Sequence, residues 1–185
     1  MIKEVKQHAQ DQMTAARDAV RARLGKLRTG KASPSLLDGL RVECYDSQMP
    51  LNQVASVAAP EPRLLTVSPY DRTIIGAIEK AIRASNLGLN PASDGLVVRV
   101  PIPELTEERR REYTKLAREI AEEGKIAVRK ARQDANDKLK KIDKDGGAPE
   151  DEISNARAEI QKLTDRFGGE IDEIAKAREA EIMSL

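Results

Sequence analysis

The chain has 185 residues, of which 34% are charged, yet the formal net charge at pH 7 is only +1. Aromatic residues make up 2%, and Cys44 is the only cysteine, which excludes an internal disulfide and a cysteine-based metal cluster. The N-terminus has no apolar signal-peptide core and no run of 18 apolar residues occurs, so we expect a cytoplasmic protein without a membrane segment.

The first segment predicts one long helix over residues 2–28. Its apolar residues recur at spacings of three and four, which places them in one stripe along a helix of about 27 residues, or roughly 40 Å. The stripe consists of Ile2, Val5, Ala9, Met13, Ala16, Val20, Leu24 and Leu27.

The stretch from Gly25 to Lys31 resembles the start of a phosphate-binding loop, G-x-x-x-x-G-K-[ST]. The eighth position is Ala32, which has no hydroxyl for Mg²⁺, and the stretch follows a helix where the motif requires a strand. We also expect that Ala32-Ser33-Pro34 does not start a helix. The stretch is therefore interpreted as a linker and not as a nucleotide site.

Residues 31–104 predict a small α/β domain, because eight of the nine prolines fall there and the apolar pattern changes. Strands are expected at 40–44, 64–67 and 96–100, where apolar runs or alternation are bounded by proline and glycine. A short helix is expected between them, capped by Asp71 and ending at Gly88. Cys44 is interpreted as a small buried strand residue.

Two further helices are predicted at 106–144 and from Pro149 onward. Thr106 is a plausible N-cap, Glu107 and Glu108 suit the positive helix end, and Gly146 and Gly147 stop the helix. The last segment keeps a 3-4-3 apolar spacing typical of closely packed antiparallel helices. Its stripe consists of Ile153, Ala156, Ile160, Leu163, Phe167, Ile171 and Ile174.

The fold predicted is therefore α+β, with a three-helix bundle (1–29 plus 106–185) and an α/β domain (31–104) inserted between its first and second helices. Two linkers, at 29–31 and 101–105, connect the parts side by side. They are interpreted as a two-stranded hinge or, as an equal alternative, as a rigid junction stiffened by proline. The hinge residues are Gly30, Lys31, Pro101, Pro103 and Glu104.

No enzyme is predicted. His8 is the only histidine, which excludes triads with a histidine base and histidine-rich metal sites. The many carboxylates lie on helix faces rich in Lys and Arg, where solvated ion pairs are the ordinary explanation. We expect neither a cofactor nor a bound metal.

Basic residues of the helix at 106–144 fall on one face. At 100° per residue, six of them lie within about 40° on either side of one line drawn along the helix surface, parallel to its axis. Asn136 and one acidic residue, Glu122, lie in the same sector. We call these six the basic ridge. Leu116, Ile120, Ala127, Ala131 and Ile142 are expected on the opposite side. The basic ridge consists of Arg111, Arg118, Lys125, Arg129, Arg132 and Lys140.

Such segregation in a nearly neutral protein indicates a polyanion partner, with Arg favoured for bidentate phosphate contacts. A solubilising helix face is the alternative explanation. Scarce aromatics argue against stacking of single-stranded bases, so contacts to the phosphates and the shape of folded or double-stranded RNA are preferred. We expect no DNA partner.

Six runs of the chain resemble bacterial ribosome recycling factor, in the order and at the spacing of that family. They are KASPSLLDGL (31–40), IEKAI (78–82), SNLGLNP (85–91), LTEERR (105–110), VRKARQDAND (128–137) and IQKLTD (160–165). The resemblance implies a three-helix bundle and an inserted α/β domain arranged in an L. It also implies a monomeric, non-enzymatic translation factor that, with elongation factor G and GTP, splits the post-termination ribosome into subunits.

Carried over by position, the family's contacts to large-subunit rRNA fall on Arg129 and Arg132, both on the basic ridge. Arg110 in LTEERR is a weaker candidate, because it lies about 100° from the ridge. Where the family commonly has R-N-x-R-R-D-A-N-D, this chain has Lys130 and Gln133, so no charge contact is carried over to position 133.

A helical protein–protein adaptor is the alternative function. An apolar docking site would give binding that depends weakly on salt, whereas phosphate docking predicts a steep dependence.

Overall fold

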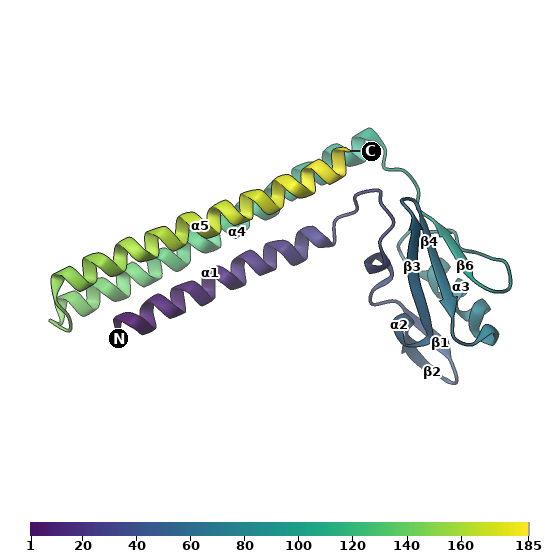
Figure 1. The fold of residues 1–185 in the computed structure, drawn as a ribbon, viewed down its shortest axis with the longest axis horizontal. Helices are drawn as coiled ribbons and strands as arrows, with labels where there is room; N and C mark the ends of the chain where they lie inside the picture. Colours follow the sequence, from purple (N-terminus) through teal and green to yellow (C-terminus); the bar gives the residue numbers. More distant parts are fainter. Residues whose placement is uncertain (185) are drawn as a thin grey trace. The chain divides into compact units, whose positions relative to one another are not determined.

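The computed structural model describes residues 1–184 and divides them into two compact units. One unit joins residues 1–29 to the chain from Glu107 onward, and the other comprises Gly30–Thr106. The first is all helical and the second mixes helices with strands (Figure 1). No helix in the described part of the chain is long and apolar enough to cross a membrane.

The helical unit contains α1 (Ile2–Gly25), α4 (Glu107–Lys144) and α5 (Glu150–Met183), and each of these helices packs against the other two. Their apolar stripes meet in one core whose only fully buried aromatic residue is Phe167. The predicted stripes of α1 and α5 are confirmed. α1 ends at Gly25 and not at residue 28, although Leu27 beyond it is still buried.

At Gly124, α1 and α4 approach one another closely. A Cβ atom added there would overlap Cγ2 of Val20 and would lie 3.4 Å from Cδ1 of Ile171. The glycine therefore belongs to the core of the bundle, where any side chain would press the helices apart.

The second unit contains a four-stranded antiparallel sheet in the order β3-β4-β6-β5 and a β1–β2 hairpin. Leu65 and Val67 of β4 face Val100 and Val98 of β6, and all four side chains are fully buried. The helix α3 packs against β1, β5 and β6 and contributes Ile78 to the same core. The strands are β1 (Arg41–Cys44), β2 (Ser47–Pro50), β3 (Ala55–Glu61), β4 (Leu64–Pro69), β5 (Ala92–Ser93) and β6 (Val98–Pro101), and the helices are α2 (Leu51–Val54) and α3 (Ile75–Ala84).

Two local expectations are wrong. Pro34 does start a helix: the Ser33 side chain caps a short 3₁₀ helix, η1 (Pro34–Leu37), because Pro suits a first helical position and Ser an N-cap. The helix after Asp71 ends at Ala84 and not at Gly88. The Asp71 cap is confirmed, since its carboxylate accepts the Thr73 N–H at the start of η2 (Arg72–Ile74). Cys44 is buried in β1, as expected.

Candidate nucleic-acid interface

Part of the basic ridge lies at the seam between α4 and α5. On a helical wheel of α4, the midpoint of the buried face lies about 100° from the midpoint of the ridge. The buried face is therefore beside the ridge and not opposite to it. Leu116 and Ala127 lie on the side of α4 opposite the ridge, but both are exposed, so that side is not the buried face. The ridge is consequently not the outermost face of α4, and part of it borders α5.

Two ridge cations form ion pairs with carboxylates of α5. Arg118 donates to both carboxylate oxygens of Glu179, at 3.1 and 3.2 Å. Lys125 lies 3.1 Å from Asp172, a contact that is the main cause of its raised pKa. These pairs hold the cations along the seam, although Arg118 remains 71% exposed.

Lys125 and a third ridge cation, Arg129, share Glu122, the acidic residue within the same sector. The carboxylate accepts a 2.7 Å bond from Arg129 and lies 3.3 Å from Lys125. These contacts, Arg129 first, lower the pKa of Glu122, which is therefore ionised at neutral pH. At the N-terminal end of the ridge, Arg111 pairs with Glu107 at 2.5 Å.

Arg132 differs from these four cations. Its only polar partner within the described chain is the amide oxygen of Gln161 on α5, at 3.3 Å, and no described carboxylate lies within 4 Å of it. Gln161 is itself oriented by the bond from its Nε2 to Asp165, at 2.9 Å. Arg132 is thus held at the seam with its positive charge uncompensated at short range, which suits it to an external anion.

Arg110 lies apart from the ridge. It is partly buried, and its Nε atom is enclosed without a hydrogen-bond partner in the described structure. Its angular position coincides with the buried face of α4, so the structure places it toward the bundle at the start of the helix. Gln133, where the family commonly has arginine, is exposed.

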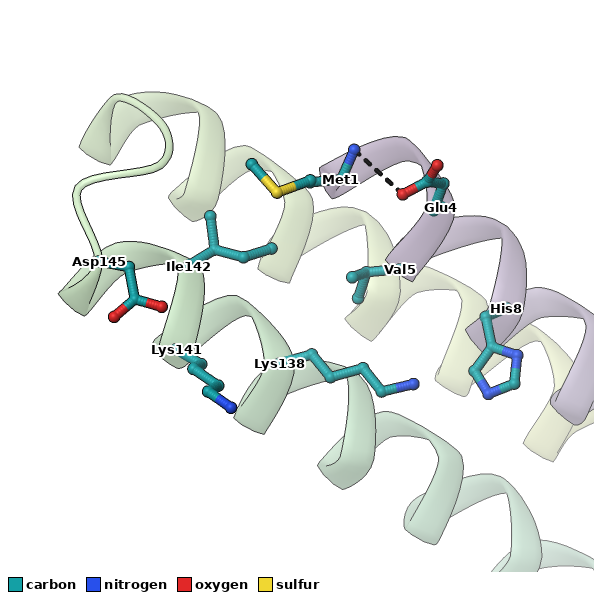
Figure 2. A pocket seen from close by; sticks show the side chains of 8 residues that line it. All are labelled: Met1, Glu4, Val5, His8, Lys138, Lys141, Ile142 and Asp145. Carbon is teal, nitrogen blue, oxygen red and sulfur yellow. Dashed lines mark ion pairs between the residues drawn. The ribbon is translucent and has the colours of Figure 1, made fainter.

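A hollow of about 410 Å³ at the other end of α4 mixes both charges (Figure 2). Lys138 and Lys141 line it together with the carboxylates of Glu4 and Asp145, and Ile142 adds an apolar wall. Glu4 pairs with the N-terminal amine at 3.3 Å. With the N-terminal amine, three cationic groups face two carboxylates, so the hollow has an excess of only one positive charge.

Near the first linker, the end of α1 is fixed to α5. The guanidinium of Arg178 donates to the backbone carbonyls of Leu27 and Gly25, at 2.6 and 3.1 Å. Arg178 also pairs with Glu181 at 2.7 Å, which orients it for this contact. The chain beyond the helix therefore stays anchored to the bundle up to Leu27.

Inside the second unit, both linkers are bonded to the turn between β3 and β4. Ala32 donates its N–H to the Pro62 carbonyl at 2.7 Å, and Ile102 donates to the Arg63 carbonyl at 2.8 Å. The Arg63 guanidinium also pairs with Glu104.

The predicted hinge residues are therefore not alike. Pro101 is the last residue of β6, paired with Leu64, whereas Gly30 lies between the two anchored segments and has a φ of 79°. Lys31 and Pro103 are exposed.

Sequence reasoning on α4 alone could not find the carboxylates of α5 or the Arg178 contact. Asp172, Glu179 and Arg178 reach their partners only through packing of segments that are far apart in the chain. Only the intrahelical pairs, such as Arg111 with Glu107 at i, i+4, were accessible from spacing.

The structure thus has three long helices, an α/β unit inserted after the first, and a row of exposed or partly exposed cations along α4. A family model described as ribosome recycling factor matches residues 20–183. The ribosome-recycling factor of Shouchella clausii is 52% identical over 185 residues, with all of both chains covered, and that of Halalkalibacterium halodurans is 50% identical over the same span.

Solved structures agree with these relatives. A solution structure of a ribosome recycling factor matches with a TM-score of 0.80 and 37% identity, covering 100% of this chain and 98% of that one. A second match, with a TM-score of 0.66 and 45% identity over 99% of each chain, belongs to models for the T. thermophilus ribosome recycling factor and the E. coli elongation factor G bound to the E. coli post-termination complex. The chain belongs to the ribosome recycling factor family.

Proposed function

We propose that this protein binds the post-termination ribosome in the cytoplasm and, together with elongation factor G, splits it into subunits. The partner hydrolyses GTP, and this chain contributes binding and positioning without a catalytic step of its own. The observation that carries the proposal is Arg132, a guanidinium held at the α4–α5 seam with no described carboxylate within reach. Support comes from the solved relative bound to a post-termination complex with elongation factor G.

The basic ridge docks on phosphates of large-subunit rRNA in this proposal, with Arg129 and Arg132 as the central contacts. Arg118, Lys125 and Arg111 extend the contact along α4, and Arg110 supports it from the start of the helix. The existing ion pairs do not prevent this, because exposed pairs stabilise a protein by about 0–1 kcal/mol. A phosphate that offers a charge-assisted, bidentate contact can therefore replace Glu122 or Glu179 at small cost.

The linkers act as a hinge in the same proposal. Elongation factor G pushes on the inserted unit and the linkers, and the bundle then moves against contacts that bridge the subunits. The anchoring bonds at Leu27, Ala32 and Glu104 leave Gly30, Lys31 and Leu105 between fixed segments. Rotation is therefore assigned to these residues, while Pro101 and Pro103 move with the inserted unit.

Docking is tested by co-sedimentation with vacant ribosomes over a salt series. We expect Arg132→Gln to weaken binding and to reduce the slope of log K against log salt concentration by about one. Lys130→Gln is the matched control, because it removes one charge from the same helix, from an exposed site about 120° from the ridge. Equal effects of the two variants would refute the ridge, and binding with little salt dependence would favour the adaptor function.

The hinge is tested at Gly30, whose φ of 79° is strained for any other residue. Gly30→Ala should leave ribosome affinity unchanged and slow subunit splitting by elongation factor G and GTP. Gly39→Ala is the matched control, because Gly39 has a φ of 80° and no neighbouring atom within 4 Å of an added Cβ, but lies within the inserted unit. Equal slowing by both substitutions would assign the effect to strain in that unit and not to the hinge.

A further inference from the structure

A second basic surface lies between α1 and α5, on the other side of α5 from the ridge. It is a groove of about 400 Å³ whose walls come from the first turns of α1 and the middle of α5. Four cationic side chains and one carboxylate line it, and its only aliphatic wall is the partly buried Leu163. The charged residues are Lys3, Lys6, Glu159, Lys162 and Arg166. We call this site the α1–α5 groove.

The positive charge of the α1–α5 groove is only partly compensated. Lys6 pairs across the groove with Glu159 at 2.5 Å. Lys3 on one wall and Lys162 on the other have no carboxylate within 4 Å among the described residues. With four cations against one carboxylate, this groove has a larger excess of positive charge than the hollow in Figure 2, and an anion between the walls would neutralise it.

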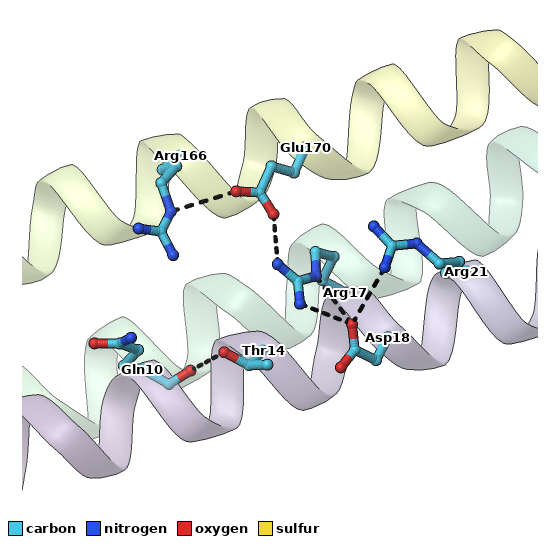
Figure 3. A network of polar contacts seen from close by, with 7 residues as sticks. All are labelled: Gln10, Thr14, Arg17, Asp18, Arg21, Arg166 and Glu170. Carbon is cyan, nitrogen blue, oxygen red and sulfur yellow. Dashed lines mark hydrogen bonds and ion pairs between the residues drawn. The ribbon is translucent and has the colours of Figure 1, made fainter.

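The guanidinium of Arg166 is fixed in place. It lies 4.6 Å from the centre of the buried Phe167 ring and 3.3 Å from Glu170. Glu170 also accepts a 2.8 Å bond from Arg17 of α1, and this pair continues to Asp18 and Arg21 (Figure 3). The network joins α1 to α5 beside the groove and holds Arg166 ready for a ligand, which lowers the entropy cost of binding.

We propose that the α1–α5 groove is a second docking surface for RNA phosphates, separate from the basic ridge. The inference rests on the proposed function. It places RNA at two surfaces of the bundle, the basic ridge and the α1–α5 groove, which lie on either side of α5. An RNA backbone is the occupant that fits, because two uncompensated lysines and a fixed guanidinium match repeated negative charges. A docked helix or peptide would instead require an apolar floor, which Leu163 alone does not provide.

The salt dependence of binding to large ribosomal subunits tests the groove. Lys3→Gln with Lys162→Gln should reduce the log–log slope by about two. Affinity at 0.1 M salt should fall by up to about 100-fold if affinity at 1 M is unchanged. Arg41→Gln with Lys80→Gln is the control, since it removes two exposed charges from the other unit. A change no larger than that of the control would overturn the inference.

Additivity separates this inference from the ridge. The groove residues and Arg132 share no described partner, so Arg132→Gln should lower affinity by the same factor with or without the two groove substitutions. If the wild type did not bind ribosomes, the proposed function would fail. If the wild type and Arg132→Gln behaved as expected but the groove variant matched its control, only the groove would be rejected.

A photo-crosslink identifies what occupies the groove. Gln7 lines it, is uncharged and, among the described residues, bonds only to Asp11 of its own helix, so a photoreactive residue there leaves the cations intact. Crosslinking to rRNA in the bound complex supports the inference. Crosslinking to a ribosomal protein, or no crosslink from a variant that still binds, would overturn it.

Discussion

Gly124→Ala should destabilise the bundle even though alanine is the better helix former. In an exposed helix the substitution would stabilise by about 1 kcal/mol. Here the new Cβ would overlap Cγ2 of Val20, a residue that is 2% exposed and has one strongly preferred rotamer in a helix. Relief requires α1 and α4 to separate. Overpacking costs about 1–3 kcal/mol, and the upper part of this range applies here because the overlap with Val20 is severe, so the cost exceeds the helix gain of about 1 kcal/mol.

The net effect expected is a loss of about 1–2 kcal/mol in the free energy of unfolding. For a unit of this size the midpoint of thermal unfolding should fall by roughly 4–10 °C. Urea unfolding followed by circular dichroism measures it, with an unchanged m-value showing that stability itself has changed. Gly169→Ala on α5 is the matched control, because its added Cβ has no neighbour within 4 Å, and it should stabilise by about 0.5–1 kcal/mol.

A double-mutant cycle tests the reasoning directly. Val20→Ala alone should destabilise by about 2 kcal/mol through the lost methyl groups and the cavity left behind. In the Gly124→Ala background it should cost at least 0.5 kcal/mol less, because the new Cβ occupies the vacated space. If Gly124→Ala proved as stabilising as Gly169→Ala, or if the two effects simply added, the close approach of α1 and α4 would not limit the choice of residue at 124.

Three further outcomes follow from contacts in both units. Asp71→Asn should lower the thermal midpoint at pH 7, because Tyr45 first and then Thr73 stabilise the carboxylate and lower its pKa. A carboxylate whose pKa is lowered by folding stabilises the fold above the pKa of the unfolded state, about 3.9. The difference in thermal midpoint between variant and wild type should therefore shrink as the pH falls below about 4. A difference of unchanged size at pH 2.5 would contradict this cause. Asp46 has a φ of 57° in the β1–β2 turn, so Asp46→Gly should stabilise the second unit by about 0.5–1 kcal/mol in urea unfolding. Asp46→Ala should destabilise it. Equal effects of the two substitutions would show that the backbone conformation is not the cause. Arg178→Gln should speed amide hydrogen exchange in the last turn of α1 about tenfold or more by removing both carbonyl contacts, and unchanged exchange would show that Arg178 does not anchor that turn.

The strands show how far local patterns reach. β4 and β6 are predictable because buried residues such as Leu65 and Val100 alternate along them with residues that are partly or fully exposed. β3 and β5 are not, since their residues are mostly exposed and β5 is only Ala92–Ser93. Such edge segments become strands through their hydrogen bonds to β4 and β6, and no pattern in their own side chains indicates this.

In the candidate site, too, some features follow from the sequence and others only from packing. The row from Arg111 to Lys140 is a property of one helix, so its angular spacing follows from the sequence and 100° per residue. Which of its cations are compensated is a tertiary property, because Asp172 and Glu179 reach the row only through packing of α5 on α4.

The sequence alone therefore determined the three long helices, the apolar stripes of α1 and α5, the inserted α/β region and the row of cations. Each of these depends on local features, namely helical spacing, strand alternation or the position of prolines. Tertiary structure alone decided the α1–α5 groove, whose walls are joined by Lys6 and Glu159, 153 positions apart. It also decided that Arg132 keeps an uncompensated charge and that Gly124 admits no side chain. The physical reason is that electrostatic compensation and close packing depend on distance in space, which local periodicity does not specify.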